Sequence, residues 1–338
     1  MTRVRITQID GSLPNLALMR LARWHRDRGD EVTFRDTVER DLFEPAYDRV
    51  YGSAIFKFSK PNVERFRGQF PGAVIGGTGV PGAPPLEAVA PGIGAEVDYA
   101  DYPDFQASVG FLTRGCRLRC SFCVVPEKEG RPYAENTVAG LWRGEPYPRH
   151  LHLLDNDFFG TPEWERHIAD IRDGGFRVCF SQGINVRIIN KRIAEALRSI
   201  EYRDTRFRRR RLYMAWDNLG DESRFFRGID YLEAAGIPAS HVMAYMLIGY
   251  DPDETFSDIE YRFGRMVERG ILPYPMVYDR SVDLHRHFQR WAVTGLYRAV
   301  PFSEYKPNWV ARANVPRAAK TLAADPGATT HNVLEAAR

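Results

Sequence analysis

Three of the four cysteines of this chain lie in residues 110–123, Gly110-Phe-Leu-Thr-Arg-Gly-Cys116-Arg-Leu-Arg-Cys120-Ser-Phe-Cys123. The apolar pattern over Val109–Thr113 predicts a strand, and three cysteines follow it at C-x3-C-x2-C spacing. The 338 residues include four cysteines, too few for a disulfide framework. Three thiols gathered on one loop therefore indicate metal or redox chemistry in a reducing compartment.

Three thiolates on one loop can hold three irons of a cubane cluster and leave the fourth iron without a protein ligand. We expect Arg114, Arg117 and Arg119, which flank the cysteines, to lower the pKa of these thiols. The alternative is a structural zinc site completed by a histidine or Cys179, although such sites normally use paired arms from two hairpins. Cys179 lies in an apolar strand pattern and is expected to be a core residue.

In these residues the chain resembles the radical S-adenosylmethionine (radical SAM) superfamily, whose loop is CxxxCxxC with an aromatic residue, here Phe122, before the last cysteine. The resemblance implies that Cys116, Cys120 and Cys123 are catalytic residues and metal ligands of a [4Fe-4S] cluster whose open iron chelates S-adenosyl-L-methionine. A flavodoxin- or ferredoxin-type one-electron donor would then trigger cleavage to a 5′-deoxyadenosyl radical, which abstracts hydrogen from an unidentified substrate. The protein would be an iron–sulfur enzyme of oxidoreductase or transferase type. Its own tasks would be to bind and orient the cofactor and the substrate and to exclude water.

The part from residue 101 to 282 alternates between strand and helix patterns. Six strand–helix units predict a partial (βα)6 TIM-type barrel with its site at the carboxyl ends of the strands. The alternative is a flat doubly wound sheet, in which the site would lie at the same strand ends. The expected strands are 109–113, 150–154, 178–181, 212–216, 242–248 and 275–278, and the expected helices are 136–143, 163–173, 190–200, 221–235 and 254–269.

Residues 1–100 predict a smaller α/β domain with a Rossmann-like parallel sheet, and residues 283–338 a C-terminal helical extension with a helix at 285–296. In architecture the first domain resembles a cobalamin-binding domain. The DxHxxG loop that gives a histidine to cobalt is absent, because residues 36–41 contain no histidine. Cobalamin bound without a protein histidine, and a degenerate domain used for packing or substrate, are both left as alternatives.

Polar residues after the second and third strands of the barrel are expected to bind S-adenosylmethionine. In similar proteins an acidic motif here contacts the methionine amino group, a role that fits Asp155 or Asp157. The alternative is that these aspartates cap a helix or form a turn. Gln182 lies on the same rim, and Arg187 is expected to pair with the methionine carboxylate or to form a surface ion pair.

The fourth and fifth strands end in further candidate cofactor-binding residues. Asp217 and Asn218 could hydrogen-bond the ribose hydroxyls. Gly249 would allow close approach to the adenine, and Ile248 would pack on its face. The turn over residues 246–255 resembles the Gly-[aromatic]-x-x-x-[ET] turn of the branch with methylthiotransferases and cobalamin-dependent members, but its Glu254 and Thr255 are expected to begin a helix.

Residues 120–131 resemble the cluster segment of methylthiotransferases, which modify tRNA or a ribosomal protein. Those enzymes hold a second cluster on three N-terminal cysteines, whereas this chain has none before Cys116. A tRNA- or DNA-modifying radical SAM enzyme, or a methylthiotransferase-like enzyme, is one alternative. A non-catalytic Fe–S or cobalamin-binding carrier or regulatory protein is the alternative of another class.

The net charge of +3 is nearly neutral and is weak support for a nucleic-acid partner. The arginine run 203–211 would suit a phosphate-bearing or nucleic-acid substrate, and the basic and aromatic residues of 286–298 would suit base stacking. A solvated loop and an ordinary packed helix are the alternatives. Without a signal peptide or an apolar span of ~20 residues, the chain is expected to be cytoplasmic, without a membrane partner.

Overall fold

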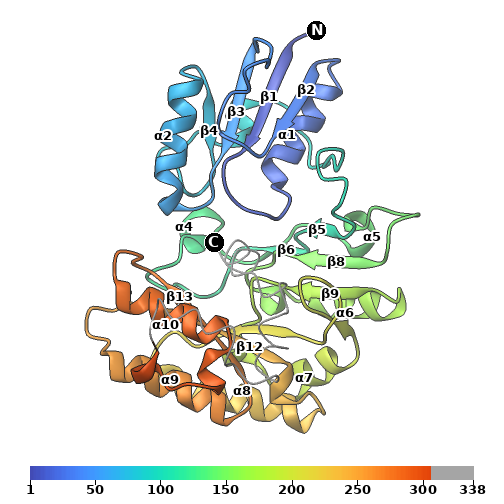
Figure 1. Cartoon of the computed structure of the whole chain (residues 1–338). Coiled ribbons are helices and arrows are strands. Elements are labelled where there is room, and N and C mark those ends of the chain that lie inside the picture. Colours follow the sequence, from blue (N-terminus) through green and yellow to red (C-terminus); the bar gives the residue numbers. More distant parts are fainter. Residues whose placement is uncertain (306–338) are drawn as a thin grey trace. The chain divides into compact units, whose positions relative to one another are not determined.

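The computed structural model describes residues 1–305, which form a mixed α/β protein with parallel sheets and ten α-helices (Figure 1). The chain divides into two compact units, one from Met1 to Val109 and one beginning at Gly110. The part of the predicted C-terminal extension after residue 305 lies outside the described residues. Within residues 1–305, no helix has both the length and the apolar character needed to cross a bilayer.

The first unit contains a four-stranded, all-parallel sheet in the order β2-β1-β3-β4, so the predicted parallel sheet is confirmed. Its central strand β1 buries Val4 and Ile6 completely, and Asn15 caps the first helix by accepting the N–H groups of Ala17 and Leu18. The elements are β1 (Arg3–Gln8), α1 (Leu16–Arg26), β2 (Glu31–Arg35), β3 (Arg49–Ser53), α2 (Lys60–Gln69), β4 (Val74–Gly76) and α3 (Leu86–Val89).

The second unit contains two larger sheets, in the orders β10-β9-β8-β5 and β11-β12-β13, and a small hairpin, β6-β7. Hydrogen bonding among the described strands does not join the two larger sheets into a barrel. They are adjacent, because Ile184 N donates to Tyr213 O at 2.7 Å. The strands are β5 (Ser108–Gly110), β6 (Thr113–Arg114), β7 (Tyr133–Ala134), β8 (His150–Leu153), β9 (Arg177–Phe180), β10 (Glu201–Tyr202), β11 (Leu212–Ala215), β12 (Val242–Ile248) and β13 (Leu272–Val277).

Amphipathic helices follow the strands of the second unit, and Figure 1 shows α6 to α9 in succession around the outside of the strands. In α8 the residues Phe225, Ile229 and Leu232 recur at helical spacing and are fully buried. The helices are α4 (Val125–Lys128), α5 (Val138–Leu141), α6 (Trp164–Asp173), α7 (Lys191–Arg198), α8 (Glu222–Ala234), α9 (Phe256–Glu268) and α10 (Asp283–Val293).

Three predicted elements have different bounds in the structure. The last strand begins three residues earlier than expected, at Leu272, and tolerates Pro273 and Pro275 because β13 is an edge strand that needs fewer N–H donors. The helix predicted at 136–143 is a single turn, since Trp142 already has extended backbone angles. The predicted strand 109–113 is divided into β5 and β6, because residues 113–114 pair with β7 in a hairpin around the cysteines that was not predicted.

The aromatic residues of α10 lie in the core. Phe288 and Trp291 are 1% and 6% exposed, and both rings pack against Phe263 of α9. This is the packed amphipathic helix that was the alternative to base stacking. These two rings are therefore not available to a nucleic acid in this structure.

Candidate functional site

The cysteine loop runs between the two short strands β6 and β7. Its base is held by Glu129, whose carboxylate accepts Gly115 N at 3.0 Å and Arg114 Nη2 at 2.7 Å. Cys116 N donates to Gly130 O at 3.1 Å, and Gly115 has a left-handed φ of 80°. A Cβ at position 115 would collide with the carbonyl of Arg131, so only glycine allows this close passage.

The middle of the loop is clamped by Asp157. Its carboxylate accepts hydrogen bonds from Arg117 Nε at 2.7 Å, Arg117 Nη2 at 2.8 Å and Arg117 N at 3.2 Å. Asp157 is only 2% exposed and immediately precedes the short 3-10 helix η2 (Phe158–Gly160). Asp157, one of the two candidates for binding the methionine amino group, therefore already accepts hydrogen bonds from the cysteine loop.

The second aspartate, Asp155, fastens the beginning of the loop. It is 4% exposed and accepts Leu112 N at 3.2 Å, Thr113 N at 2.6 Å and Thr113 Oγ1 at 2.8 Å. Burial raises the pKa of Asp155 to about 7, although these hydrogen bonds act in the opposite direction. Asp155 and Asp157 thus tie the end of β8 to both sides of the cysteine loop.

The three cysteines are half-buried, and besides burial, neighbouring thiols contribute to the raised pKa values of Cys116 and Cys123. Burial is the largest cause that raises the pKa of Cys116, to about 11, and it also raises the pKa of Cys123. The prediction that the flanking arginines lower these pKa values was wrong for Cys116 and Cys123. Arg117 and Arg114 are instead paired with Asp157 and Glu129, and burial is the largest cause acting on these two thiols.

The donor chemistry of the loop suits an iron–sulfur cluster with an open iron. It offers three thiols, while the fourth cysteine, Cys179, is 0% exposed in β9, which confirms its prediction as a core residue. Among residues 1–305, however, no group of three or more His, Cys, Asp or Glu side chains is already arranged around a single ion. The donor types therefore fit, while the side chains are not arranged as ligands.

An aromatic chain links the cysteine loop to the turns after β12 and β13. The Phe122 ring meets the Tyr250 ring edge-on, with centroids 5.4 Å apart, and Tyr250 meets Tyr278 in the same way at 4.9 Å. Phe122 thus contacts the turn after β12 through Tyr250. Burial is the largest cause that raises the pKa of Cys123, and Cys120 and Glu129 add to it. The carboxylate of Asp217, which follows β11 in sequence, makes a smaller contribution in the same direction.

Arg262 is a positioning residue that the sequence analysis missed. It is 0% exposed on α9 and donates to Trp216 O at 2.8 Å and to Leu247 O at 2.9 Å, and it pairs with Glu254. It thereby joins the carboxyl ends of β11 and β12. The signal available in the sequence was its place on the apolar stripe of α9, three residues after Ile259.

The turn after β12 needs its glycine. Gly249 has a left-handed φ of 77°, and a Cβ there would lie 2.5 Å from His285 Nδ1 of α10. Gly249 N donates to Glu254 Oε2 at 3.4 Å, and Thr255 caps α9 through a capping box, which confirms that helix start. Ile248 is 0% exposed in the core, so none of its faces is open in this structure.

Two of the remaining candidates contact Asp221. Arg187 Nη1 donates to Asp221 at 2.8 Å, so the structure shows an ion pair, as the alternative expected, although this pair is half-buried and not on the surface. Asn218 is exposed and its Nδ2 donates to the same carboxylate at 3.3 Å. Gln182 is half-buried two residues after β9. Asp217 is half-buried, accepts Leu247 N at 2.9 Å, and has a pKa raised by burial.

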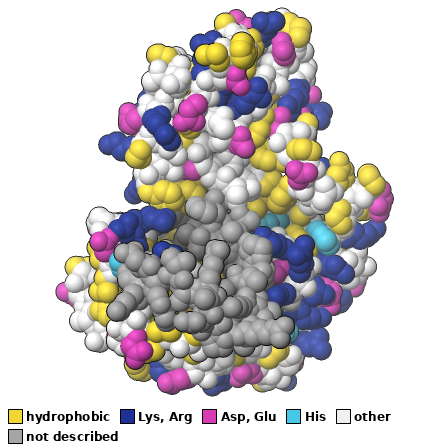
Figure 2. All heavy atoms as spheres, in the orientation of Figure 1, with side chains coloured by type: hydrophobic (Ala, Val, Ile, Leu, Met, Phe, Trp, Pro, Cys, Tyr) yellow, Lys and Arg dark blue, Asp and Glu magenta, His cyan; other side chains and the backbone are white. Residues whose placement is uncertain are grey.

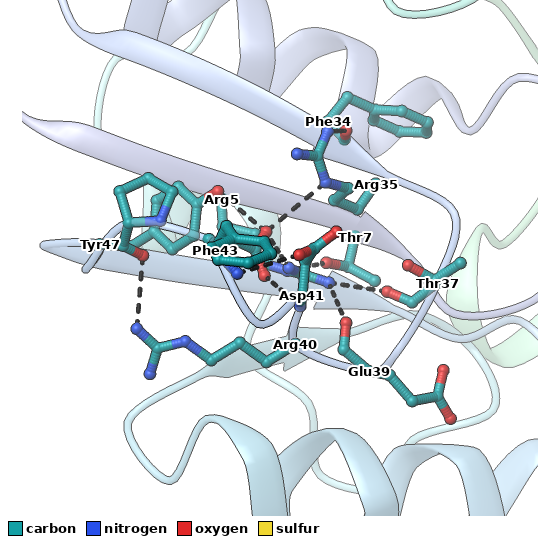
Figure 3. Close-up of polar contacts among 12 residues, drawn as sticks. Arg5, Thr7, Phe34, Arg35, Thr37, Glu39, Arg40, Asp41, Phe43 and Tyr47 are labelled. Carbon is teal, nitrogen blue, oxygen red and sulfur yellow. Dashed lines mark hydrogen bonds and ion pairs between the residues drawn. The ribbon is translucent and has the colours of Figure 1, made fainter.

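The first unit has its own buried polar cluster, shown in Figure 3. Arg5 on β1 is 0% exposed, pairs with Glu44, and donates to Thr37 O at 2.8 Å and Thr7 Oγ1 at 3.0 Å. Tyr47 also donates to Glu44, at 2.9 Å. These contacts fasten the segment after β2, where the cobalt-binding histidine motif is missing, onto the sheet.

Comparison with known proteins gave no match: no protein-family model, no curated protein and no solved structure matches this chain.

Proposed function

We propose that this protein is a radical SAM enzyme in which Cys116, Cys120 and Cys123 bind a [4Fe-4S] cluster. The observation that carries the proposal is the fastening of this three-thiol loop to the carboxyl end of β8 through Asp155 and Asp157. Loops at the carboxyl ends of parallel strands are the usual place for chemistry in such folds. Three thiols on one loop also match a cluster that leaves one iron open.

The bound cluster and S-adenosylmethionine would supply a 5′-deoxyadenosyl radical for hydrogen abstraction from the substrate. This chain's residues would bind and orient the cofactor and the substrate, and they would exclude water from the site. The Arg117–Asp157 pair would hold the loop in place, and the rings of Phe122, Tyr250 and Tyr278 would cover it on the side of β12 and β13. Asp217, half-buried after the carboxyl end of β11, is our candidate for the ribose hydroxyls.

We also propose that the two larger sheets are parts of a partial (βα)6 barrel and that the first unit is Rossmann-like. Two hydrogen bonds between the sheets support the barrel. Ile184 N donates to Tyr213 O at 2.7 Å, and Tyr245 of β12 donates its hydroxyl to Ser181 O, after β9, at 2.8 Å. For the first unit, the strand order β2-β1-β3-β4 with parallel pairing is the supporting observation.

The test is anaerobic reconstitution with iron and sulfide, followed by dithionite and S-adenosylmethionine. We expect about four irons per chain, cluster absorbance and release of 5′-deoxyadenosine. Cys120→Ala should lose all three, while the matched control Cys179→Ser should keep them, since Cys179 lies in β9 away from the loop. Intact wild-type protein that gives neither cluster nor 5′-deoxyadenosine would overturn the proposal.

The same preparation answers two related questions. Corrin content, measured beside iron, tests whether the first unit holds cobalamin; a degenerate domain should contain none. Replacing dithionite by a reduced flavodoxin or ferredoxin tests the class of electron donor. Because free thiols and such clusters persist under reducing conditions, we infer a cytoplasmic location.

A further inference from the structure

The arginine run at 203–211 is sorted into two groups by the structure. Arg203 and Arg210 both pair with Glu201, at 2.6 Å and 2.5 Å, so these two arginines share one carboxylate just before the run. The others line a pocket of about 300 Å³ together with one arginine that follows α10. The arginines of this pocket are Arg206, Arg208, Arg209, Arg211 and Arg298. Figure 2 likewise shows that basic side chains are unevenly spread, with many on the α6–α7 side of the second unit.

The pocket lies at the amino ends of β11, β12 and β13, where it is lined by Tyr213, Met243 and Tyr274. The cysteine loop contacts the turns after the carboxyl ends of the last two of these parallel strands. At about 3.3 Å per residue, the seven residues of β12 separate the two ends by about 20 Å. A small molecule in this pocket would therefore not reach the cysteine loop, and the pocket is a separate site.

The arginine loop has a defined conformation. Asp204 accepts the N–H of Arg208 on its carboxylate at 2.8 Å and the N–H of Phe207 on its carbonyl at 2.8 Å. Phe207 has a left-handed φ of 58°, which is strained for a residue with a side chain, and its ring stacks on His150 at 4.4 Å. Such strain persists only where the surroundings fix it, and it commonly marks a binding segment.

The lining of the pocket combines two kinds of chemistry. Five arginines and a single carboxylate, Asp204, contribute to it. Apolar residues, which include Met243 and Pro273, contribute to the same lining. Arg211 is half-buried and burial lowers its pKa, so a bound anion would stabilise a charge that is poorly solvated. A guanidinium group can donate two parallel hydrogen bonds to two oxygens of one phosphate or carboxylate, which makes arginine well suited to bind these anions.

We propose that this pocket binds a mononucleotide, with its phosphate on the arginines and its nucleoside against the apolar part of the lining, which includes Met243 and Pro273. The volume is at the lower end of the range of roughly 300–1,000 Å³ for small-molecule sites, which suits one nucleotide rather than a larger cofactor. The inference does not depend on the proposed radical chemistry, because it uses different residues at the other end of the strands.

Isothermal titration with GMP and with UMP tests the proposal, since neither contains the adenine of S-adenosylmethionine. We expect one saturable site per chain for at least one of them. The double variant Arg208→Ala/Arg298→Ala should weaken binding about tenfold or more, because charged hydrogen bonds to phosphate are lost. Arg166→Ala, an arginine 75% exposed on α6, is the matched control and should bind as the wild type does. Cys120→Ala should also bind normally.

Four results would overturn the proposal: no binding of either nucleotide at millimolar concentration, unchanged binding in the double variant, inorganic phosphate binding as tightly as the nucleotides, or a single-stranded oligonucleotide binding more tightly than either. The third would remove the role of the apolar lining residues. The fourth would assign the arginines to a nucleic acid instead. A circular-dichroism spectrum and melting temperature equal to those of the wild type would show that the double variant is folded.

Discussion

Arg117 and Asp157 form a two-pronged ion pair that joins the centre of the cysteine loop to the residue before η2, with Nε and Nη2 at 2.7 Å and 2.8 Å from the two carboxylate oxygens. The backbone N–H of Arg117 donates to the same side chain. Asp157 is 2% exposed, whereas the Arg117 side chain is 41% exposed. The buried carboxylate therefore fixes the position of the more exposed arginine.

Asp157→Asn should loosen the loop with little change in size. We expect the free energy of unfolding of the metal-free protein to fall by about 1–3 kcal/mol, since charge-assisted bonds to a buried acceptor are lost. Iron bound after reconstitution should fall as well. Urea denaturation and iron analysis measure the two effects. Asp170→Asn is the control, because its 3.8 Å pair with Arg166 is on the surface and should contribute almost nothing. Equal behaviour of the two variants would refute this role of Asp157.

Arg262→Met should be the most destabilising of the changes considered. The variant keeps the length of the side chain but leaves Trp216 O, Leu247 O and Glu254 without their donor. Breaking a buried ion pair in this way typically costs about 3–5 kcal/mol. Arg265→Met, one turn along the same helix, removes a half-exposed pair with Glu222 and should cost less than about 1 kcal/mol. Urea denaturation of both variants checks the difference, and similar midpoints would show that Arg262 is not the link between β11 and β12.

Local patterns were sufficient for much of the fold. Apolar runs located the strands of the second unit, and the Thr255 capping box fixed the start of α9, because these signals depend on near neighbours in sequence. Cys179 could be assigned to the core for the same reason. The ends of short elements, such as the single turn α5, could not be predicted from local patterns, because the stability of a short helix depends on its tertiary contacts.

The partners of charged residues could not be predicted in this way. Asp157 and Arg117 are 40 residues apart, and nothing local distinguishes Asp157 as a loop anchor from a cofactor ligand. The same holds for Arg187, whose partner Asp221 lies 34 residues away. The thiol pKa values were misjudged because the sequence shows the nearby arginines but not the burial of the cysteines or the carboxylates that already pair with Arg114 and Arg117.

Gly249→Ala should destabilise the protein for two separable reasons. Alanine at a φ of 77° is strained by about 1–2 kcal/mol, and its Cβ would also meet His285 at 2.5 Å. Gly270→Ala isolates the first cost, since it has a φ of 78° and nothing within 4 Å of the added Cβ. We expect Gly249→Ala to lose more stability than Gly270→Ala, and His285→Ala to restore part of the difference in the double variant. If the two glycine variants unfold at the same urea concentration, His285 does not press on this turn.

His152 predicts a specific loss of stability in acid. It is 0% exposed in β8, its Nε2 lies 2.8 Å from Ser181 Oγ, and burial lowers its pKa to about 4. The unfolded chain, with a histidine pKa of about 6.5, therefore binds a proton that the folded protein does not between about pH 6.5 and 4. Stability from this group is present above pH 6.5 and is lost as the pH falls.

The size of that loss can be measured against a variant that does not titrate. Between pH 7.5 and pH 5 the free energy of unfolding of the wild type should fall by about 2 kcal/mol more than that of His152→Gln, whose amide can still reach Ser181. Asp155, whose pKa is raised to about 7, acts in the opposite direction over this range, but it does so equally in both proteins and cancels in the comparison. Urea denaturation at the two pH values measures the difference. Parallel changes in the two proteins would mean that His152 is protonated as easily when folded as when unfolded, and that burial does not hold it neutral.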